Sequence, residues 1–274
     1  MLNLFFFSFI FLFGLIVGSF LNCVIYRLET GGSFLKGRSF CPHCKKELTW
    51  QDLIPIFSFI WLRGKCRYCQ QKISWQYPLV ELATGLVFLL ILRQFSLPVE
   101  ALSEAGIFQF LNLIYYWIIA SFLIVIFVYD LKHYIIPDKI IYPAIIVSAV
   151  WYAAAKIFFN LYTGGEILKI ACAALASAAF FLFIVLVSRG KWMGAGDIRL
   201  AFLMGLFLGW PGVLVALSLA FYGGAIVGLG LIAFGKKKFK SEVPFAPFLV
   251  AGTFLALFWG NELAGWYQTI FLPR

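Results

Sequence analysis

The amino-acid sequence predicts an all-α polytopic membrane protein, with about eight transmembrane helices and one polar loop between the first and the second. Hydrophobic residues make up 63% of the 274 residues and charged residues 12%, against about 45–50% and about 25% in soluble proteins. Apolar stretches close to the ~20-residue length of a membrane span recur along the whole chain. Most of the chain is therefore expected to lie in lipid.

The first apolar stretch, from Leu2 to Tyr26, has the position of a secretory signal but not its features. It has no basic segment before it, it is long for the apolar core of a signal, and Arg27 follows it in place of a small-residue cleavage site. We therefore expect a retained first span.

Seven further apolar stretches follow as candidate spans. The sixth span overall is short because Gly209-Trp210-Pro211-Gly212 interrupts the pattern, and proline and glycine both break helices. The eight predicted spans cover residues 3–26, 79–95, 110–129, 140–158, 167–188, 198–210, 212–234 and 245–270.

The basic residues orient these spans. Eighteen of the 22 Lys and Arg residues fall in the segments 27–78, 130–139, 189–199 and 235–244, which lie on one side of the membrane if the spans alternate. The positive-inside rule then places these four segments in the cytoplasm and both termini outside.

This arrangement also explains the net charge of +10. The cations flank helices in four separate loops instead of forming one stripe, so they give no support to nucleic-acid binding. Attraction to anionic membrane lipids is compatible with them. We detect no internal sequence repeat, and the sequence carries no signal of an oligomeric state.

The polar segment divides the chain into a first transmembrane helix at 1–26, a cytoplasmic loop at 27–78 and a membrane core at 79–274. The loop holds Cys41-Pro-His-Cys44 and Cys66-Arg-Tyr-Cys69, with twenty-one residues between the pairs. Two such Cys-x-x-Cys turns can supply a tetrahedral zinc site. Two disulfides, or free thiols, are the alternatives, but a cytoplasmic loop lies in a reducing compartment.

The predicted metal is structural zinc in a zinc-ribbon-like loop. Four thiolates would fill every coordination position and leave none for water. The loop has too few apolar side chains to build a core of its own, so the metal would hold it together. His43 lies inside the first turn and is expected to be solvated.

Four acidic residues lie beside or within the predicted spans: Glu81, Asp130, Asp138 and Asp197. Ionisable groups at membrane depth are costly, so each is a functional candidate. Asp130 closes the third span and Asp197 opens the sixth, both at the predicted cytoplasmic face. The transmembrane order therefore brings two carboxylates to one membrane depth.

Two carboxylates in one confined site can divide into an acid and a base, because both cannot ionise cheaply. Such a pair can hydrolyse a peptide: the ionised member takes a proton from water and the protonated member polarises the carbonyl. Gly194 and Gly196, just before Asp197, would let a substrate backbone come close because they have no Cβ.

Structural roles explain the same aspartates equally well from chemistry alone. Asp197 at a helix N-terminus can be a cap that meets the helix dipole. Asp130 at a span end can be simply solvated. Asp138, after Pro137, is expected to cap the fourth helix.

Several segments together resemble a known family, the type IV prepilin leader peptidases, which remove the leader of prepilins and pseudopilins and methylate the new N-terminus. An aspartate at the end of one span, a Gly-x-Gly-Asp element at the start of a later one and the cysteine loop are specific in combination. The matching segments are 18–22, 25–28, the two cysteine turns together with 64–67, which runs into the second turn, 77–81, 130–138, 194–197 and 244–249. Ala246 and Arg199 depart from the common residues of the family.

The resemblance implies a bifunctional enzyme of the bacterial inner membrane, with Asp130 and Asp197 as its catalytic pair. It implies cleavage after a leader glycine at the cytoplasmic face, on substrates of type IV pili or type II secretion. It implies N-methylation with S-adenosylmethionine as donor, in the form of the enzyme that carries the four-cysteine loop. Substrate helices and membrane lipids are the implied partners.

Two residues near the loop have open roles. Glu81 could hold the new ammonium group in methyl transfer, or pair with Arg27 or another loop cation to fix the second helix. Asn22, in the first span, could contact substrate or bridge helices by hydrogen bonds. No glycine-rich strand-to-helix motif for a nucleotide cofactor is present, so a methyl-donor site must be built from the first span, the loop and the start of the second span.

Two other classes of function remain as alternatives. An ion-coupled or proton-coupled transporter could use Asp130 and Asp197 as a relay, and a helix broken at mid-membrane would favour it. A scaffold could recruit a cytoplasmic partner through the cysteine loop, but it would leave both aspartates without a role.

Overall fold

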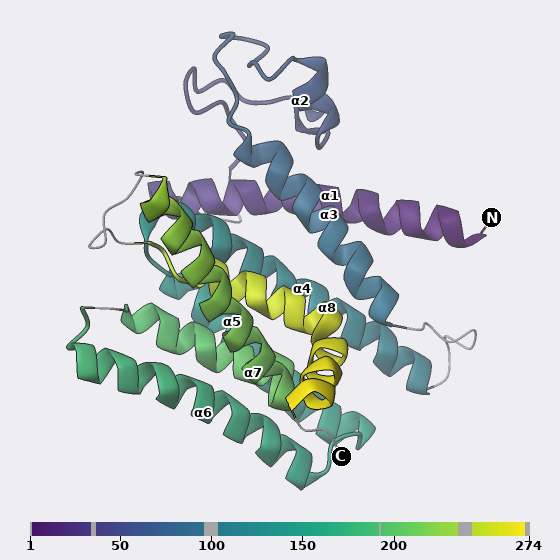
Figure 1. Ribbon diagram of the computed structural model, residues 1–274. Helices are drawn as coiled ribbons and strands as arrows, with labels where there is room; N and C mark the ends of the chain where they lie inside the picture. The colour runs from purple at the N-terminus through teal and green to yellow at the C-terminus, as the bar shows by residue number, and fades with distance from the viewer. Residues whose placement is uncertain (1, 34–36, 96–103, 192, 235–242, 272–274) are drawn as a thin grey trace. The chain divides into compact units, whose positions relative to one another are not determined.

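The computed structural model describes residues 2–33, 37–95, 104–191, 193–234 and 243–271 (Figure 1). Regular structure in these ranges is helical, with two isolated β-bridges and no strand. The helices are α1 (Leu2–Thr30), the 3-10 helix η1 (Trp50–Leu53), α2 (Phe57–Trp61), α3 (Gln76–Gln94), α4 (Glu104–His133), α5 (Asp138–Phe159), α6 (Gly164–Ser188), α7 (Ala195–Ala233) and α8 (Ala246–Phe271).

Six of the described helices, α1 and α3 to α7, are long and apolar enough to cross a membrane, and α8 adds a shorter apolar stretch at Ala246–Gly260. At about 1.5 Å per residue the 39 residues of α7 would extend about 58 Å, against a membrane core of about 30 Å. The helical backbone breaks at Gly209 (φ 61°, ψ −166°) and Trp210 (φ −96°, ψ 137°), and the ribbon changes direction sharply there (Figure 1).

The two halves of α7 correspond to the predicted sixth and seventh spans. Counted separately, they bring the long helical segments of the described chain to eight, as the sequence predicts. Gly209 is what permits the break, because φ near +60° is a conformation that glycine adopts without the steric cost of a side chain.

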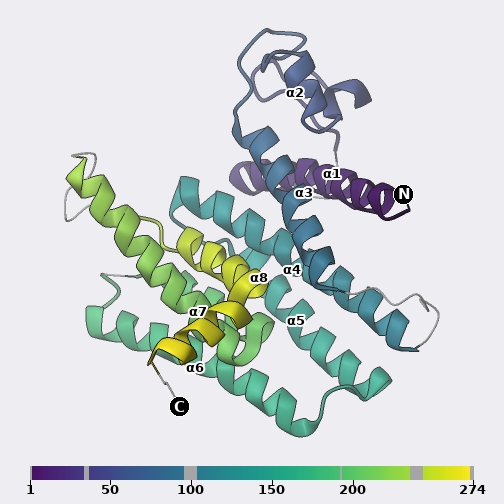
Figure 2. The ribbon, with the colours of Figure 1, turned by 45° about the vertical axis from the view of Figure 1, so that its right-hand side comes forward.

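The chain forms two compact units (Figure 2). Unit 1 contains Met1–Leu97 and Tyr116–Val125, and unit 2 contains Pro98–Tyr115 and Ile126–Arg274. The predicted cysteine loop lies in unit 1 between α1 and α3, and both Asp130 and Asp197 lie in unit 2.

In unit 1, α1 and α3 approach each other through small residues. A Cβ on Gly14 would come within 2.7 Å of the Gly85 Cα, and one on Gly18 within 2.6 Å of the Glu81 Cα. Such close backbone approach replaces the hydrophobic effect as a packing force inside a membrane. Trp117 of α4 stacks on Phe88 at 5.0 Å between ring centroids.

In unit 2, α7 packs in the same manner against α6 and α8. A Cβ on Gly205 would meet the Ala174 Cα at 2.4 Å, and one on Gly252 would meet the Ala216 carbonyl oxygen at 2.4 Å. The Ser177 hydroxyl donates to the Ala201 carbonyl at 2.8 Å across the α6–α7 contact. These contacts fix α7 relative to both of its neighbours.

Two glycines of α7 provide a test of this packing. We expect Gly205→Ala to lower the free energy of unfolding by about 1–3 kcal/mol, because the added methyl group has no room against Ala174. We expect Gly228→Ala, which meets nothing within 4 Å, to leave stability unchanged or slightly raised. Thermal unfolding of both purified variants in detergent checks this, and equal melting temperatures would contradict the packing account.

Candidate active site and metal centre

Three of the four acidic residues that the sequence analysis named lie at helix ends in unit 2. Asp130 lies in the last turn of α4, Asp138 begins α5, and Asp197 is the third residue of α7. The side chains of Asp130 and Asp197 are nearly buried, at 5% and 8% exposure. In the described part of the chain no Lys or Arg forms an ion pair with either of them.

Asp130 is held by the start of α8. Its carboxylate accepts a hydrogen bond from the backbone N–H of Ala246, the first residue of that helix. The first N–H groups of a helix have no partner within it, so a carboxylate there is satisfied without a cation. The backbone of Ala246 makes this contact, so the contact does not depend on the side chain at that position.

Asp197 is the third residue of α7, and Gly194 is the cap residue just before that helix. Its carboxylate reaches back to accept from the Gly194 N–H, which is one half of a capping box. It also interacts electrostatically with Asp130. Asp197 is therefore not the cap residue itself, although it does contact the start of the helix, and it has a second carboxylate as neighbour.

The two glycines before Asp197 differ in their surroundings. A Cβ on Gly196 would come within 3.1 Å of the Ile136 Cβ, so packing against the α4–α5 turn favours glycine there. A Cβ on Gly194 would meet only the Gly196 nitrogen, at 3.9 Å, and its φ is −80°. Neither packing nor backbone geometry requires glycine at 194, so close approach of a substrate stays a prediction for it.

Asp138 has a different role from the predicted one. Pro137 is the residue that precedes α5, and Asp138 is already the first helical residue, so it is not the cap. Its carboxylate pairs with Arg199 of α7, whose guanidinium also lies 5.4 Å from the centre of the Tyr142 ring. This link joins the starts of α5 and α7 two residues from Asp197. The sequence shows that Asp138 and Arg199 carry opposite charges, but nothing in it predicts that they pair.

The four cysteines of the loop come together in unit 1. The sulfur atoms of Cys41, Cys44, Cys66 and Cys69 all lie within 4.8 Å of one another, and the Cys41 and Cys69 sulfurs are 3.9 Å apart. Zinc–sulfur bonds of about 2.3 Å in a tetrahedron place sulfurs about 3.8 Å apart. The donor set and its geometry therefore fit a zinc ion, and His43 is exposed and outside the group.

The crowding of the four sulfurs has an electrostatic consequence. The Gln71 N–H favours the Cys69 thiolate, but burial and the neighbouring thiols of Cys66, Cys44 and Cys41 together raise the pKa of Cys69 to about 11. A metal cation among the four sulfurs would stabilise their thiolate forms, because metal binding displaces the thiol protons.

The loop is built from two copies of one turn, so the expectation of no internal repeat is wrong. Residues 41–50 and 66–75 share Cys-x-x-Cys, a β-branched or leucine side chain, a hydroxyl and a final Trp at the same spacing. The first cysteine of each turn donates the same backbone hydrogen bond. The Cys41 N–H donates to the Lys46 carbonyl at 3.0 Å, and the Cys66 N–H donates to the Gln71 carbonyl at 2.8 Å. The signal was present in the sequence, but two copies of a turn are too few for a repeat architecture.

Asp52 of η1 ties the two turns together, and the sequence analysis overlooked it. Its carboxylate accepts from Arg67 Nε at 2.7 Å and from the Tyr68 hydroxyl at 3.1 Å, and it also meets Thr49. Burial opposes ionisation of Asp52, but these hydrogen bonds outweigh it and hold its pKa below the ordinary value. The carboxylate is therefore charged at neutral pH.

Glu81 and Asn22 connect the loop to the helices. Glu81 accepts from the Ile56 N–H at 2.7 Å and from the Ser19 hydroxyl, in place of the expected Arg27 or other loop cation. The Asn22 side chain donates to the Tyr77 carbonyl at 3.0 Å and accepts from the Gln76 side chain at 3.3 Å. Asn22 thus bridges α1 and α3, which is one of its two predicted roles.

Comparison with known proteins adds an independent line of argument. Residues 12–95 match the bacterial peptidase A24 N-terminal domain, and residues 117–229 match the type IV leader peptidase family. Three similar relatives carry the name prepilin leader peptidase/N-methyltransferase. They are from Aeromonas hydrophila (31% identical, 97% of this chain, 95% of the relative), Bacillus subtilis strain 168 (32%, 95% and 97%) and Legionella pneumophila (30%, 93% and 92%). No solved structure matches the chain.

The two glycines before Asp197 yield a prediction about stability. We expect Gly196→Ala to lower the melting temperature of the purified protein, because Ile136 must move to admit the methyl group. We expect Gly194→Ala to leave it unchanged, since the space is open. Differential scanning fluorimetry in detergent compares the two, and a larger loss for Gly194→Ala would contradict the described surroundings.

Proposed function

This chain belongs to the type IV leader peptidase family, and on that premise we propose that it is a bifunctional prepilin peptidase and N-methyltransferase of the bacterial inner membrane. It cleaves the leader of type IV prepilins or type II secretion pseudopilins after glycine, at the cytoplasmic membrane face. It then methylates the new N-terminal residue with S-adenosylmethionine. The observation that carries the proposal is the buried, electrostatically coupled pair of Asp130 and Asp197.

The pair suits hydrolysis by an activated water molecule. Neither carboxylate forms a described ion pair with a cation, so the two buried carboxylates hold one proton between them more cheaply than they hold two negative charges. The ionised member takes a proton from water as oxygen attacks the scissile carbonyl, and the protonated member donates to the carbonyl oxygen. Collapse of the tetrahedral intermediate returns a proton to the leaving nitrogen and breaks the peptide bond.

The substrate expected for the family suits this location. A short basic leader ends in glycine, and a hydrophobic helix beginning with phenylalanine follows it. Such a helix can dock in the bilayer beside the spans of the enzyme, which leaves the Gly-Phe bond at the membrane face. Burial of the aspartates at helix ends, and not at mid-helix, supports cleavage at that depth.

A structural zinc ion bound by Cys41, Cys44, Cys66 and Cys69 completes the loop. All four ligands are thiolates, so the metal would contribute folding free energy and no open coordination position. It would join the two repeated turns, which Asp52 also links.

Methyl transfer belongs to unit 1 in this proposal, within the cytoplasmic loop and the adjoining ends of α1 and α3. S-adenosylmethionine supplies the methyl group when bound. Glu81 is a candidate to orient the new ammonium group, although its contacts with Ile56 and Ser19 also support a role in fixing the loop. The cavity beside α2 is lined mainly by apolar residues and has no carboxylate among them, so it offers no partner for the sulfonium of this donor.

The transporter alternative has no support from the comparisons. The break in α7 falls at Gly209 and Trp210, far along the sequence from Asp197. Both aspartates lie at helix ends, which favours a site at the membrane face over a relay through the membrane.

Removal of either carboxylate is the test of the proposed peptidase site. We expect Asp130→Asn and Asp197→Asn each to lower cleavage of a prepilin peptide by about 10²–10⁴-fold or more, since each removes an acid or base. Asp138→Asn is the matched control: it lies at the same end of unit 2 but pairs with Arg199, and it should keep most activity. Mass spectrometry of the reaction products in detergent gives the readout.

A methylation assay distinguishes loss of the peptidase carboxylates from misfolding of the variants. Both Asp→Asn variants should still insert in membranes and methylate a substrate that has already been cleaved. Substantial cleavage by both of them would remove the pair from the mechanism.

Metal analysis tests the proposed zinc site. We expect about one zinc ion per chain in the purified protein and its loss in Cys66→Ser, because three thiolates leave the tetrahedron incomplete. Cys172→Ser, in the α6 span, should retain the metal. A wild-type protein with intact thiols and no bound metal would contradict the proposal.

A further inference from the structure

Residues 50–62 form an apolar segment of the cysteine loop that unit 1 does not bury. The segment contains η1 and α2, and neither element has a buried residue. Its single charged residue is Asp52, which joins the two cysteine turns. The exposed large apolar side chains of the segment are Trp50, Leu53, Ile54, Phe57, Ile60 and Trp61. An exposed apolar patch of this kind marks an interaction surface.

The backbone just before α2 is tied to the first turns of a membrane span. The Ile56 N–H donates to a Glu81 carboxylate oxygen at 2.7 Å. Glu81 is the sixth residue of α3, so at about 1.5 Å per residue it lies about 8 Å from the start of that span. Helices that lie flat on a membrane bury their apolar face about 5–10 Å into the boundary between headgroups and acyl chains. The hydrogen bond therefore holds α2 at the depth of a membrane interface.

Packing against the start of α3 holds α2 in the same place. The rings of Phe59 in α2 and Trp75, just before α3, are in contact, with 4.9 Å between their centroids. The hollow of about 620 Å³ beside these rings is lined almost wholly by apolar side chains. Leu79, which lines it on the α3 side, is 58% exposed. Apolar walls of this kind are costly to leave in water, so contact with a bilayer is favourable on this side.

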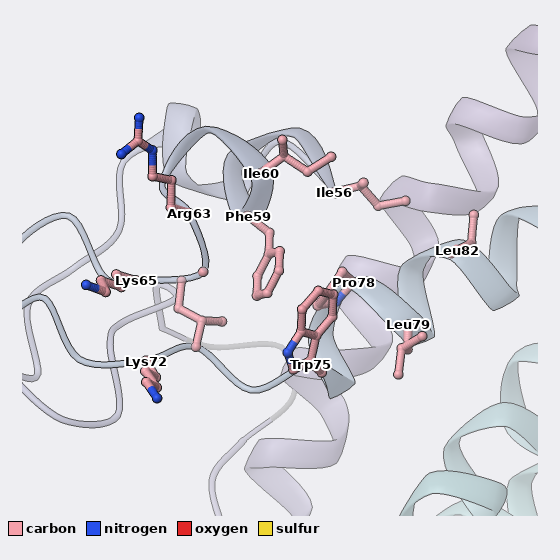
Figure 3. A pocket seen from close by; sticks show the side chains of 12 residues that line it. Ile56, Phe59, Ile60, Arg63, Lys65, Lys72, Trp75, Pro78, Leu79 and Leu82 are labelled. Carbon is pink, nitrogen blue, oxygen red and sulfur yellow. The ribbon is translucent and has the colours of Figure 1, made fainter.

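The cations of the cysteine loop are separated from the apolar segment. All nine Lys and Arg residues of the loop lie outside it. Figure 3 shows the charged ends of Arg63, Lys65 and Lys72 directed away from α3. Ile56 and Ile60 extend toward α3 in the same view (Figure 3). Apolar side chains toward the span and cations toward water are the pattern of a segment that lies on an anionic membrane surface.

We propose that residues 50–62 are an interfacial anchor, which lies in the headgroup region of the leaflet on the side of the cysteine loop. Ile60 and Trp61, 68% and 72% exposed, reach the upper part of the acyl chains, a depth at which tryptophan is enriched. The cations of the loop remain in water above the headgroups and attract anionic lipids collectively, without a site for any one lipid. The anchor fixes the four-cysteine cluster at the membrane surface. This inference does not depend on the proposed peptidase activity.

Site-specific photocrosslinking of the full-length protein tests the proposal in nanodiscs of phosphatidylglycerol and phosphatidylcholine. Benzoylphenylalanine replaces Ile60 in one variant and Lys72 in the matched control, which is also exposed but lies on the side away from α3. We expect about fivefold or more phospholipid adduct at position 60 than at position 72, because only the first probe lies among acyl chains. Mass spectrometry of the peptides gives the readout, and an unchanged melting temperature and zinc content confirm the fold of each variant.

Tryptophan fluorescence gives a second test without an artificial side chain. The difference between the wild type and Trp61→Phe isolates the emission of Trp61. We expect lipids brominated on the upper part of their acyl chains to quench this emission, and acrylamide in the water to quench it weakly.

Three results would overturn the proposal. The first is equal lipid adduct at positions 60 and 72, or none at position 60. The second is a crosslink from position 60 to a second copy of the chain in place of lipid, which would make the segment a protein interface. The third is strong quenching of Trp61 by acrylamide and none by brominated lipid, which would place α2 in water. Cleavage of a prepilin peptide is independent of all three.

Discussion

The burial of two carboxylates at neighbouring helix ends is the constraint on which unit 2 depends. A charged group at this depth is costly unless it has polar partners. Asp130 finds one in the first N–H of α8 and Asp197 finds one in the N–H of Gly194. Both partners are backbone groups at helix starts, so the site exists only while the end of α4 and the starts of α7 and α8 stay together. The close contacts Gly205–Ala174 and Gly252–Ala216 maintain that arrangement.

The sequence predicted the elements well and their contacts poorly. Hydropathy and charge were sufficient for the order of the long helices and the break near Gly209, because lipid imposes long apolar helices. They also predicted that Asp130 and Asp197 lie near each other, and the two carboxylates do interact. Their catalytic role stays a prediction. The Ala246 contact could not be predicted, since every non-proline residue has the same backbone N–H. The cap expected at Asp138 was wrong because Pro137 occupies the cap position, and the Asp138 side chain pairs instead with Arg199, which is distant in sequence.

Unit 1 is stabilised in a different way from unit 2. The segment between α1 and α3 has few buried side chains, so it relies on polar links: the four-cysteine cluster, Asp52 between the turns, and Glu81 with Ile56. The repeat of the cysteine turn places equivalent backbone hydrogen bonds on both sides of the cluster. At the equivalent β-bridge the second copy has Lys65 and Lys72, where the first has Phe40 and Glu47.

The central claim is that Asp130 and Asp197 activate a water molecule that cleaves the leader directly. Mass spectrometry after a single turnover in ¹⁸O water, with S-adenosylmethionine and a prepilin-type substrate, tests it most directly. The account predicts one ¹⁸O atom in the new glycine carboxylate of the leader, one methyl group on the new N-terminus, and no cleavage by Asp197→Asn. A leader released without ¹⁸O, or a substrate left intact where a known relative cleaves it, would contradict the account.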